Sequence, residues 1–111
     1  MPGPLDGYRI VDLTTMISGP MATCLLGDQG ADVIKVEAPG VGDLVRRLGS
    51  SREGITATFA TTNRNKRSIV LDFKQDDDMA AFRKLVETAD VVVQNFRPGV
   101  VDRIGIGEKD L

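Results

Sequence analysis

The chain has 111 residues, of which 41% are hydrophobic and 27% charged, with a formal net charge of −2 and no histidine. This length and composition are typical of one globular domain. The net charge gives no electrostatic basis for nucleic-acid binding. The sequence contains no apolar run of the roughly 20 residues needed to span a bilayer. Without histidine, Ser-His-Asp and Cys-His catalytic arrangements are excluded within the chain, and with one cysteine no zinc site of the usual kind is expected.

Residues 8–37 are predicted to form a β-α-β unit. Residues 9–13 and 32–36 are short apolar runs with the character of strands. The helix between them is expected to open at Ser18-Gly19-Pro20, because Ser18 is a good cap and proline is tolerated in a first helical turn. Gly30 is expected to end that helix in a left-handed conformation.

Residues 38–67 are predicted to be an irregular excursion. Its start, residues 38–43, is rich in turn-forming residues, and residues 55–62 are compatible with a short helix. The basic residues Arg64, Lys66 and Arg67 are interpreted as a solvated turn. Connections of this length within a domain are unusual and are often functional.

Residues 68–104 are predicted to form a second β-α-β unit, with strands at residues 68–72 and 90–93. The acidic run Asp76 to Asp78 favours the start of a helix, and a short helix is expected after Pro98-Gly99. Short apolar runs of this kind indicate parallel strands covered on both faces by helices. The predicted fold class is therefore α/β, an open and mainly parallel sheet.

Ligands of open parallel sheets bind beyond the carboxyl ends of the strands. The residues expected there include Thr14 to Ser18, Glu37 and Ala38, Phe73 and Lys74, and Gln94 to Arg97, with Arg103 further on. Cations and aromatic rings suit an anionic ligand with a flat ring, such as a nucleotide or a coenzyme containing one. The alternative is that the cations are solvated strand ends and the rings belong to the core.

Several sequence motifs carry a family resemblance. In order they are Pro4-Leu5-Asp6-Gly7, Val11 to Thr14, Ser18-Gly19-Pro20, Leu25 to Glu37, Asn63 to Ser68, Leu71-Asp72 and Ala89 to Gly99. Together they resemble the amino-terminal region of class III CoA-transferases, a superfamily that includes formyl-CoA transferase, carnitine CoA-transferase and the related alpha-methylacyl-CoA racemases.

The resemblance implies a Rossmann-like CoA-binding domain, here a single partial domain over residues 1–111 that is incomplete relative to the large domain of the family. It also implies that CoA or acyl-CoA is the ligand and that two chains associate as a dimer. By motif position, the CoA-contacting residues are Met16, Ile17, Ser18, Leu71, Asp72, Phe73, Lys74, Asn95, Phe96, Arg97 and Arg103. Ala38 stands where some transferases have an arginine.

The transferases of the family act through a catalytic aspartate, and that segment is expected to lie beyond Leu111. We therefore assign no catalytic residue and no metal ligand within the chain. The leading hypothesis is the CoA-binding part of a transferase; the alternatives are a racemase-like fragment and a stand-alone CoA-binding, nucleotide-binding or interaction module. Self-association is expected through an unpaired sheet edge, and the lone Cys24 and the lack of a signal-peptide pattern favour the cytoplasm.

Overall fold

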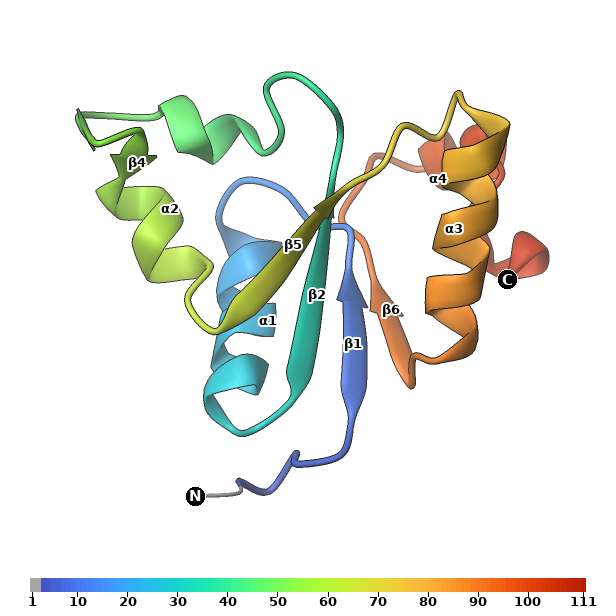
Figure 1. The fold of residues 1–111 in the computed structure, drawn as a ribbon, viewed down its shortest axis with the longest axis horizontal. Coiled ribbons are helices and arrows are strands. Elements are labelled where there is room, and N and C mark those ends of the chain that lie inside the picture. The colour runs from blue at the N-terminus through green and yellow to red at the C-terminus, as the bar shows by residue number, and fades with distance from the viewer. Residues whose placement is uncertain (1–2) are drawn as a thin grey trace.

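Four parallel strands form the central sheet in the order β5-β2-β1-β6, in a computed structural model that describes residues 3–111 (Figure 1). The strands of this sheet are β1 (Arg9–Asp12), β2 (Asp32–Glu37), β5 (Lys66–Val70) and β6 (Val91–Val93). The helices are α1 (Ser18–Asp28), α2 (Ala57–Thr62), α3 (Asp76–Glu87) and α4 (Val100–Ile104). The predicted α/β class and parallel pairing are confirmed.

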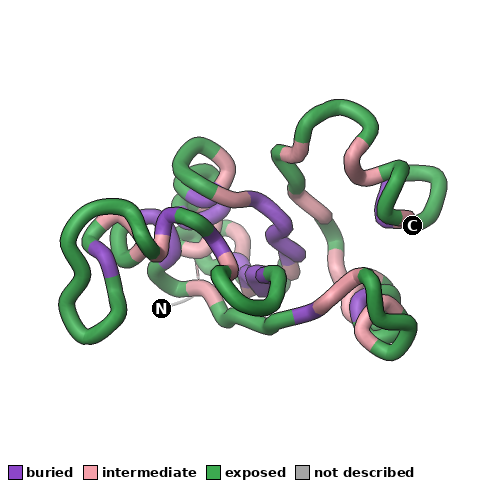
Figure 2. The backbone as a smooth tube through the Cα atoms, turned by 90° about the horizontal axis from the view of Figure 1, so that it is seen from above, coloured by how far each residue is buried: buried purple, intermediate pink, exposed green. Residues whose placement is uncertain are grey.

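Helices cover both faces of the sheet, and two apolar clusters join them to it. One cluster packs Phe82 of α3 against Val11 and Val36, and the other groups Ile10 and Val33 with Leu26 of α1. Because adjacent residues of a strand point to opposite faces, the neighbours Ile10 and Val11 serve different clusters. Buried residues concentrate in β1 and β2, and in Figure 2, which looks down on the molecule, the outlying loops are exposed.

Helix α1 ends as predicted but begins differently. Gly30 has a φ of 105°, and the amides of Gly30 and Ala31 donate to the carbonyls of Gly27 and Leu26. This pattern satisfies the last helical carbonyls and explains the glycine. The prediction that Ser18 caps the helix is wrong, because Ile17 occupies the cap position without a side-chain hydrogen bond and Ser18 is already helical.

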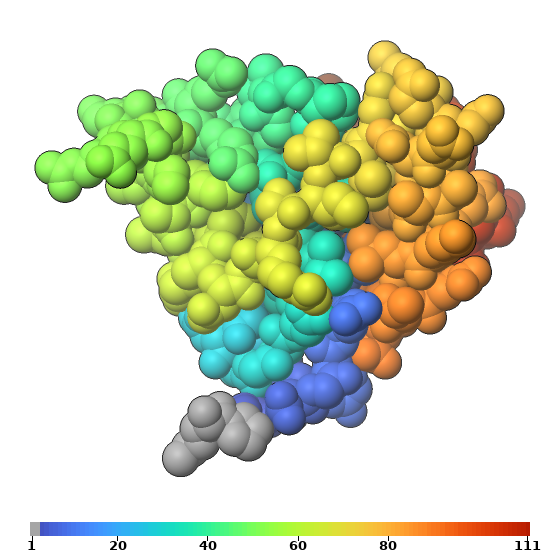
Figure 3. All heavy atoms as spheres, viewed as in Figure 1, coloured from blue at the N-terminus to red at the C-terminus, as the bar shows by residue number. Residues whose placement is uncertain are grey.

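The excursion between β2 and β5 has more regular structure than the sequence indicates. It contains the 3₁₀ helix η1 (Leu44–Arg47), the two-stranded antiparallel pair β3 (Ser51–Arg52) and β4 (Ile55–Thr56), and helix α2. The short helix is confirmed over residues 57–62, where the Thr56 hydroxyl accepts from the Phe59 amide at its start. In Figure 3 the green atoms of the excursion project away from the orange atoms of α3.

Strand β5 lies two residues earlier in the chain than the predicted strand at residues 68–72. Lys66 and Arg67 belong to it, so their interpretation as a solvated turn is wrong. Lys66 pairs in register with Val33, and its side chain is only 2% exposed. Leu71 and Asp72 consequently lie just beyond the strand, at the carboxyl edge of the sheet.

Candidate functional site

The carboxyl ends of the parallel strands open into a cleft of about 520 Å³. Its buried apolar lining comes from Leu13, Val36 and Leu71, which follow or end three neighbouring strands. The exposed cations Lys74 and Arg103 line the same cleft. The structure thus brings together the predicted site residues Leu71, Asp72, Phe73, Lys74, Phe96 and Arg103.

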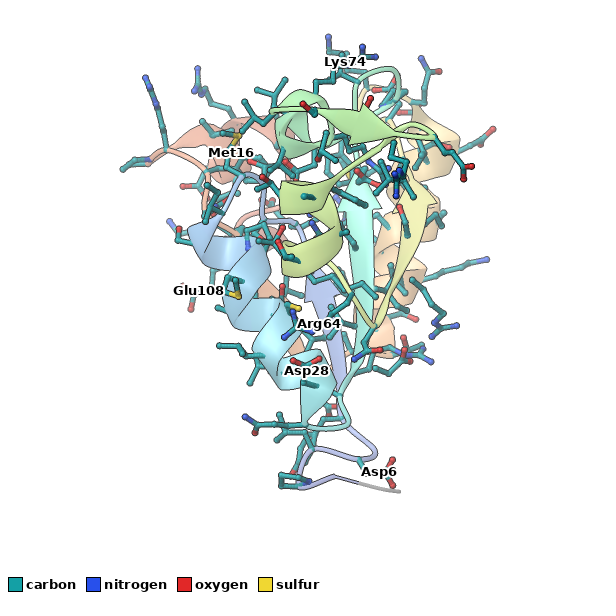
Figure 4. All side chains as sticks on the ribbon, turned by 90° about the vertical axis from the view of Figure 1, so that its left-hand side faces the viewer. Asp6, Met16, Asp28, Arg64, Lys74 and Glu108 are labelled. Carbon is teal, nitrogen blue, oxygen red and sulfur yellow. The ribbon has the colours of Figure 1, made fainter. Side chains whose placement is uncertain are left out.

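The loop after β5 is shaped by two aspartates. The Asp72 carboxylate accepts from the Lys74 amide at 3.0 Å, and Asp78 accepts from the Asp72 amide at 2.8 Å. Asp78 therefore has a role beyond the predicted favourable charge at the start of α3. Together these contacts fix the backbone that carries Lys74, whose side chain extends outward at the upper end of the molecule in Figure 4.

Three exposed cations at this edge, Lys74, Arg97 and Arg103, have no acidic partner among the described residues. Within residues 3–111, the salt bridges involve Arg9, Lys35, Arg46, Arg64, Lys66 and Arg67. Lys74, Arg97 and Arg103 form none in that part of the chain. Charge that is left uncompensated beside an apolar cleft is suited to an anionic ligand.

Both predicted aromatic residues line the cleft and also contact the core. Phe73 meets Phe82 of α3 edge-on, with ring centroids 4.9 Å apart and an interplanar angle of 66°. Phe96 packs against the same apolar cluster, and both Phe73 and Phe96 remain half-buried. The two interpretations of these rings, core residue and ligand platform, are therefore compatible.

The other predicted residues do not line the cleft. Asn95 instead clamps the loop after β1, because its side-chain amide donates to the Thr15 carbonyl at 2.9 Å and its oxygen accepts from the Thr15 amide at 3.1 Å. Thr15 itself lines the cleft, followed in the chain by Met16, Ile17 and Ser18. Arg97 is exposed beyond Phe96.

The excursion supplies cleft residues that motif matching missed: Pro39, Gly42 and Asp43. Glu37, which the strand-end argument placed at this edge, also lines the cleft. The signals for the missed residues were the turn-rich segment 38–43 and the length of the connection. Ala38 lines the cleft and is exposed.

Glu37 anchors the excursion to the sheet. Its two carboxylate oxygens accept from Arg46 at 2.7 and 2.8 Å, and the Arg46 guanidinium lies 3.8 Å from the centre of the Phe59 ring. Burial raises the pKa of Glu37, but hydrogen bonds from Arg46, Ser68 and the Asp43 amide outweigh it and lower the pKa to about 2. Glu37 is therefore ionised at neutral pH and holds residues 43–59 beside the cleft.

A second buried carboxylate, that of Asp12, lies at the end of β1. Asp12 is fully buried and accepts from Lys66 at 2.8 Å and from Thr23 at 2.7 Å, with a further short contact to the Thr14 hydroxyl. Burial raises the pKa of Asp12, but the hydrogen bonds from Lys66, Thr14 and Thr23 leave it below the ordinary value. Asp12 therefore links strand β1 to strand β5 through Lys66 and to helix α1 through Thr23.

Cys24 is buried and free, as expected of a small core residue. Among residues 3–111, no cluster of three or more potential metal-binding side chains is present. In the same residues, every helix is too short or too polar to cross a bilayer.

Comparison with known proteins agrees with the motifs. The model of CoA-transferase family III matches residues 5–111. Acetyl-CoA:oxalate CoA-transferase of Acetobacter aceti is 45% identical over 98% of this chain and 28% of its own length, and formyl-CoA:oxalate CoA-transferase of Rhodopseudomonas palustris is 49% identical over 91% and 24%. The chain thus spans about 28% of the first of these relatives.

Solved structures show the same relationship in three dimensions. A CAIB/BAIF family protein from Brucella suis superposes with a TM-score of 0.91 and 41% identity, over 99% of this chain and 30% of that protein. Fold, motif order and family match all coincide over nearly the whole chain. The chain belongs to CoA-transferase family III.

Proposed function

We propose that this chain is the CoA-binding part of an enzyme that transfers CoA between carboxylic acids. The observation that carries the proposal is the cleft, in which Lys74 and Arg103, which form no salt bridge within residues 3–111, lie beside an apolar lining at the carboxyl edge of a parallel sheet. This is where ligands of open α/β sheets bind. The transferase names of the relatives reported above favour this activity over racemisation.

The residues of the cleft fit the chemical parts of CoA. Its phosphates are anionic, and Lys74 and Arg103 supply positive charge without competing carboxylates within residues 3–111. Its adenine is a flat ring that can stack on Phe73 or Phe96. The pantetheine arm is largely uncharged, which suits the lining formed by Leu13 and Leu71.

The carboxylates of the cleft are engaged in holding its walls. Glu37 is bound by Arg46, Asp43 lies 2.9 Å from the Lys35 ammonium, and Asp72 accepts from the Lys74 amide. A carboxylate whose oxygens already accept hydrogen bonds or pair with a cation is a weaker nucleophile than a free one. The role we propose for this chain is therefore to bind and orient the CoA thioester, with no nucleophile assigned among these residues.

Isothermal titration of the full chain with CoA tests the proposal, and dephospho-CoA titrated in parallel reports the contribution of the 3′-phosphate. We expect saturable binding with a dissociation constant below about 1 mM, which corresponds to about 4 kcal/mol. No heat of binding with either ligand at millimolar concentration would contradict the proposal.

Three alanine variants locate the site. Lys74→Ala and Arg103→Ala are each expected to weaken CoA binding about fivefold or more, because each removes a charge–phosphate contact of about 1 kcal/mol. Lys84→Ala is the matched control, since Lys84 is an exposed lysine in the last turn of α3 and does not line the cleft. Equal affinities for all three variants would place the phosphates elsewhere.

A further inference from the structure

Lys35 and Asp43 form a buried ion pair beside the cleft, which Asp43 lines. Lys35 is 1% exposed and Asp43 is fully buried, and the Lys35 ammonium lies 2.9 Å from Asp43 Oδ2. That oxygen has no aligned hydrogen bond among the described residues, so the contact is an ion pair. Removing two charges from water is costly, and such pairs rarely improve stability over apolar residues.

The pair connects the two loops that lead into the cleft. From β2, Lys35 donates to the Thr14 carbonyl at 3.0 Å, at the exit of β1. In the excursion, Asp43 Oδ1 accepts from the amide of Met16 at 3.0 Å and from that of Val45 at 3.1 Å. The loop after β1 is thus held at Thr14 and at Met16 by one charged unit.

The backbone of Met16 has a conformation that requires support from its surroundings. Its φ is 74°, a left-handed conformation that residues other than glycine rarely adopt. Conformations of this kind persist where the surroundings enforce them, and they concentrate at functional sites. Asp43 accepts a hydrogen bond from the amide of Met16, and Asn95 donates to the carbonyl of the neighbouring residue Thr15.

We propose that Asp43 is a positioning residue for the CoA cleft, which acts by holding Met16 in its left-handed conformation so that the preceding residue, Thr15, is kept in the wall of the cleft. The inference rests on the proposed function, because the ligand is CoA. The inference also assigns a role to the Lys35–Asp43 pair, which is to fix the conformation of the loop after β1. Figure 4 shows Met16 at the same upper end of the molecule as Lys74, away from the Asp28–Arg64 pair.

Three variants separate positioning from stability. Asp43→Ala removes both the ion pair and the acceptor for Met16. The double variant Lys35→Met with Asp43→Asn removes both buried charges but keeps an acceptor at Oδ1. Ile10→Ala is the control for general destabilisation, because Ile10 is buried in the amino-terminal half of β1 and does not line the cleft.

Two quantities are measured for each variant: the CoA dissociation constant by calorimetry and the hydrogen exchange of the Met16 amide by NMR. For Asp43→Ala we expect about tenfold weaker binding, the usual effect of losing a hydrogen bond to a charged group, together with fast exchange at Met16. The double variant is expected to restore slow exchange and to bind within about threefold of the unaltered chain, a difference of less than a full hydrogen bond.

Unchanged exchange at Met16 in Asp43→Ala overturns the inference, whatever the chain binds. Equal losses of affinity in Asp43→Ala and Ile10→Ala also overturn it, since both would then reflect stability. If the unaltered chain binds no CoA, the proposed function fails, and the exchange measurement still decides whether Asp43 holds the loop.

Discussion

Acidification is expected to release the excursion from the sheet through one group, Glu37. In the folded chain its pKa is about 2, against an ordinary value of 4.5, because bonds to Arg46, Ser68 and the Asp43 amide outweigh the effect of burial. A group with a depressed folded pKa contributes stability that is complete above its unfolded pKa. That contribution is lost as the pH falls from about 4.5 towards 2.

The size of the effect follows from the shift. A difference of about 2.5 pKa units, at about 1.4 kcal/mol each, corresponds to about 3 kcal/mol of stability at neutral pH. This is an upper figure, because Arg46 is 33% exposed and its attraction is partly screened by water. Integrating between the two pKa values, about 2 kcal/mol of it is lost between pH 7 and pH 3.

Urea unfolding of the unaltered chain and of Glu37→Gln at pH 7 and pH 3 isolates this contribution. Glutamine keeps an acceptor for the Asp43 amide but carries no charge, so Asp12 and the other shifted carboxylates cancel in the comparison. We expect Glu37→Gln to be the less stable protein by about 3 kcal/mol or less at pH 7 and by clearly less at pH 3. A difference between the two proteins that does not depend on pH would refute the reasoning.

Four further predictions follow from packing, backbone geometry and charge. Phe82→Ala should lower the free energy of unfolding by about 3–5 kcal/mol, since it opens a cavity in a fully buried site; a loss below about 1 kcal/mol in urea would contradict this packing. Gly30→Ala should cost more than about 1 kcal/mol, because of its positive φ and the backbone 3.1 Å from an added Cβ; an unchanged melting temperature would count against it. Asp12→Ala should cost about 3–5 kcal/mol by leaving Lys66 buried and unpaired, whereas Asp12→Asn should cost less; equal costs in urea unfolding would argue against the ion pair. Light scattering should show self-association, because β5 and β6 end the sheet and Val70 is 58% exposed; a monodisperse monomer would contradict it.

The parallel sheet could be predicted because the sequence signals for its strands and helix ends are local. Short apolar runs, the proline in the first turn of α1 and Gly30 at its end each act within a few residues. Burying those runs on both faces of the sheet accounts for the two apolar clusters, whereas the order of the strands was not predicted. Most of the residues that line the cleft could also be predicted, because the carboxyl ends of parallel strands lie at one edge of the sheet.

The exceptions involve contacts between residues far apart in the chain. Lys66 and Arg67 have the composition of a turn, but they enter β5 because Asp12 neutralises Lys66 and Asp32 binds Arg67. No spacing links Lys66 to a carboxylate 54 residues away. The role of Asp43 depends likewise on Met16, which lies 27 residues earlier.

Binding of CoA in the cleft is the central claim, and chemical-shift mapping of the full chain by NMR tests it most directly. CoA is added to the isotope-labelled protein, and backbone amide shifts are followed to saturation. The account predicts that the largest changes cluster at residues 13–16, 71–74, 95–97 and 103–104, with little change at the amino-terminal ends of the strands. An unchanged spectrum at millimolar CoA, or changes confined to another face of the molecule, would contradict it.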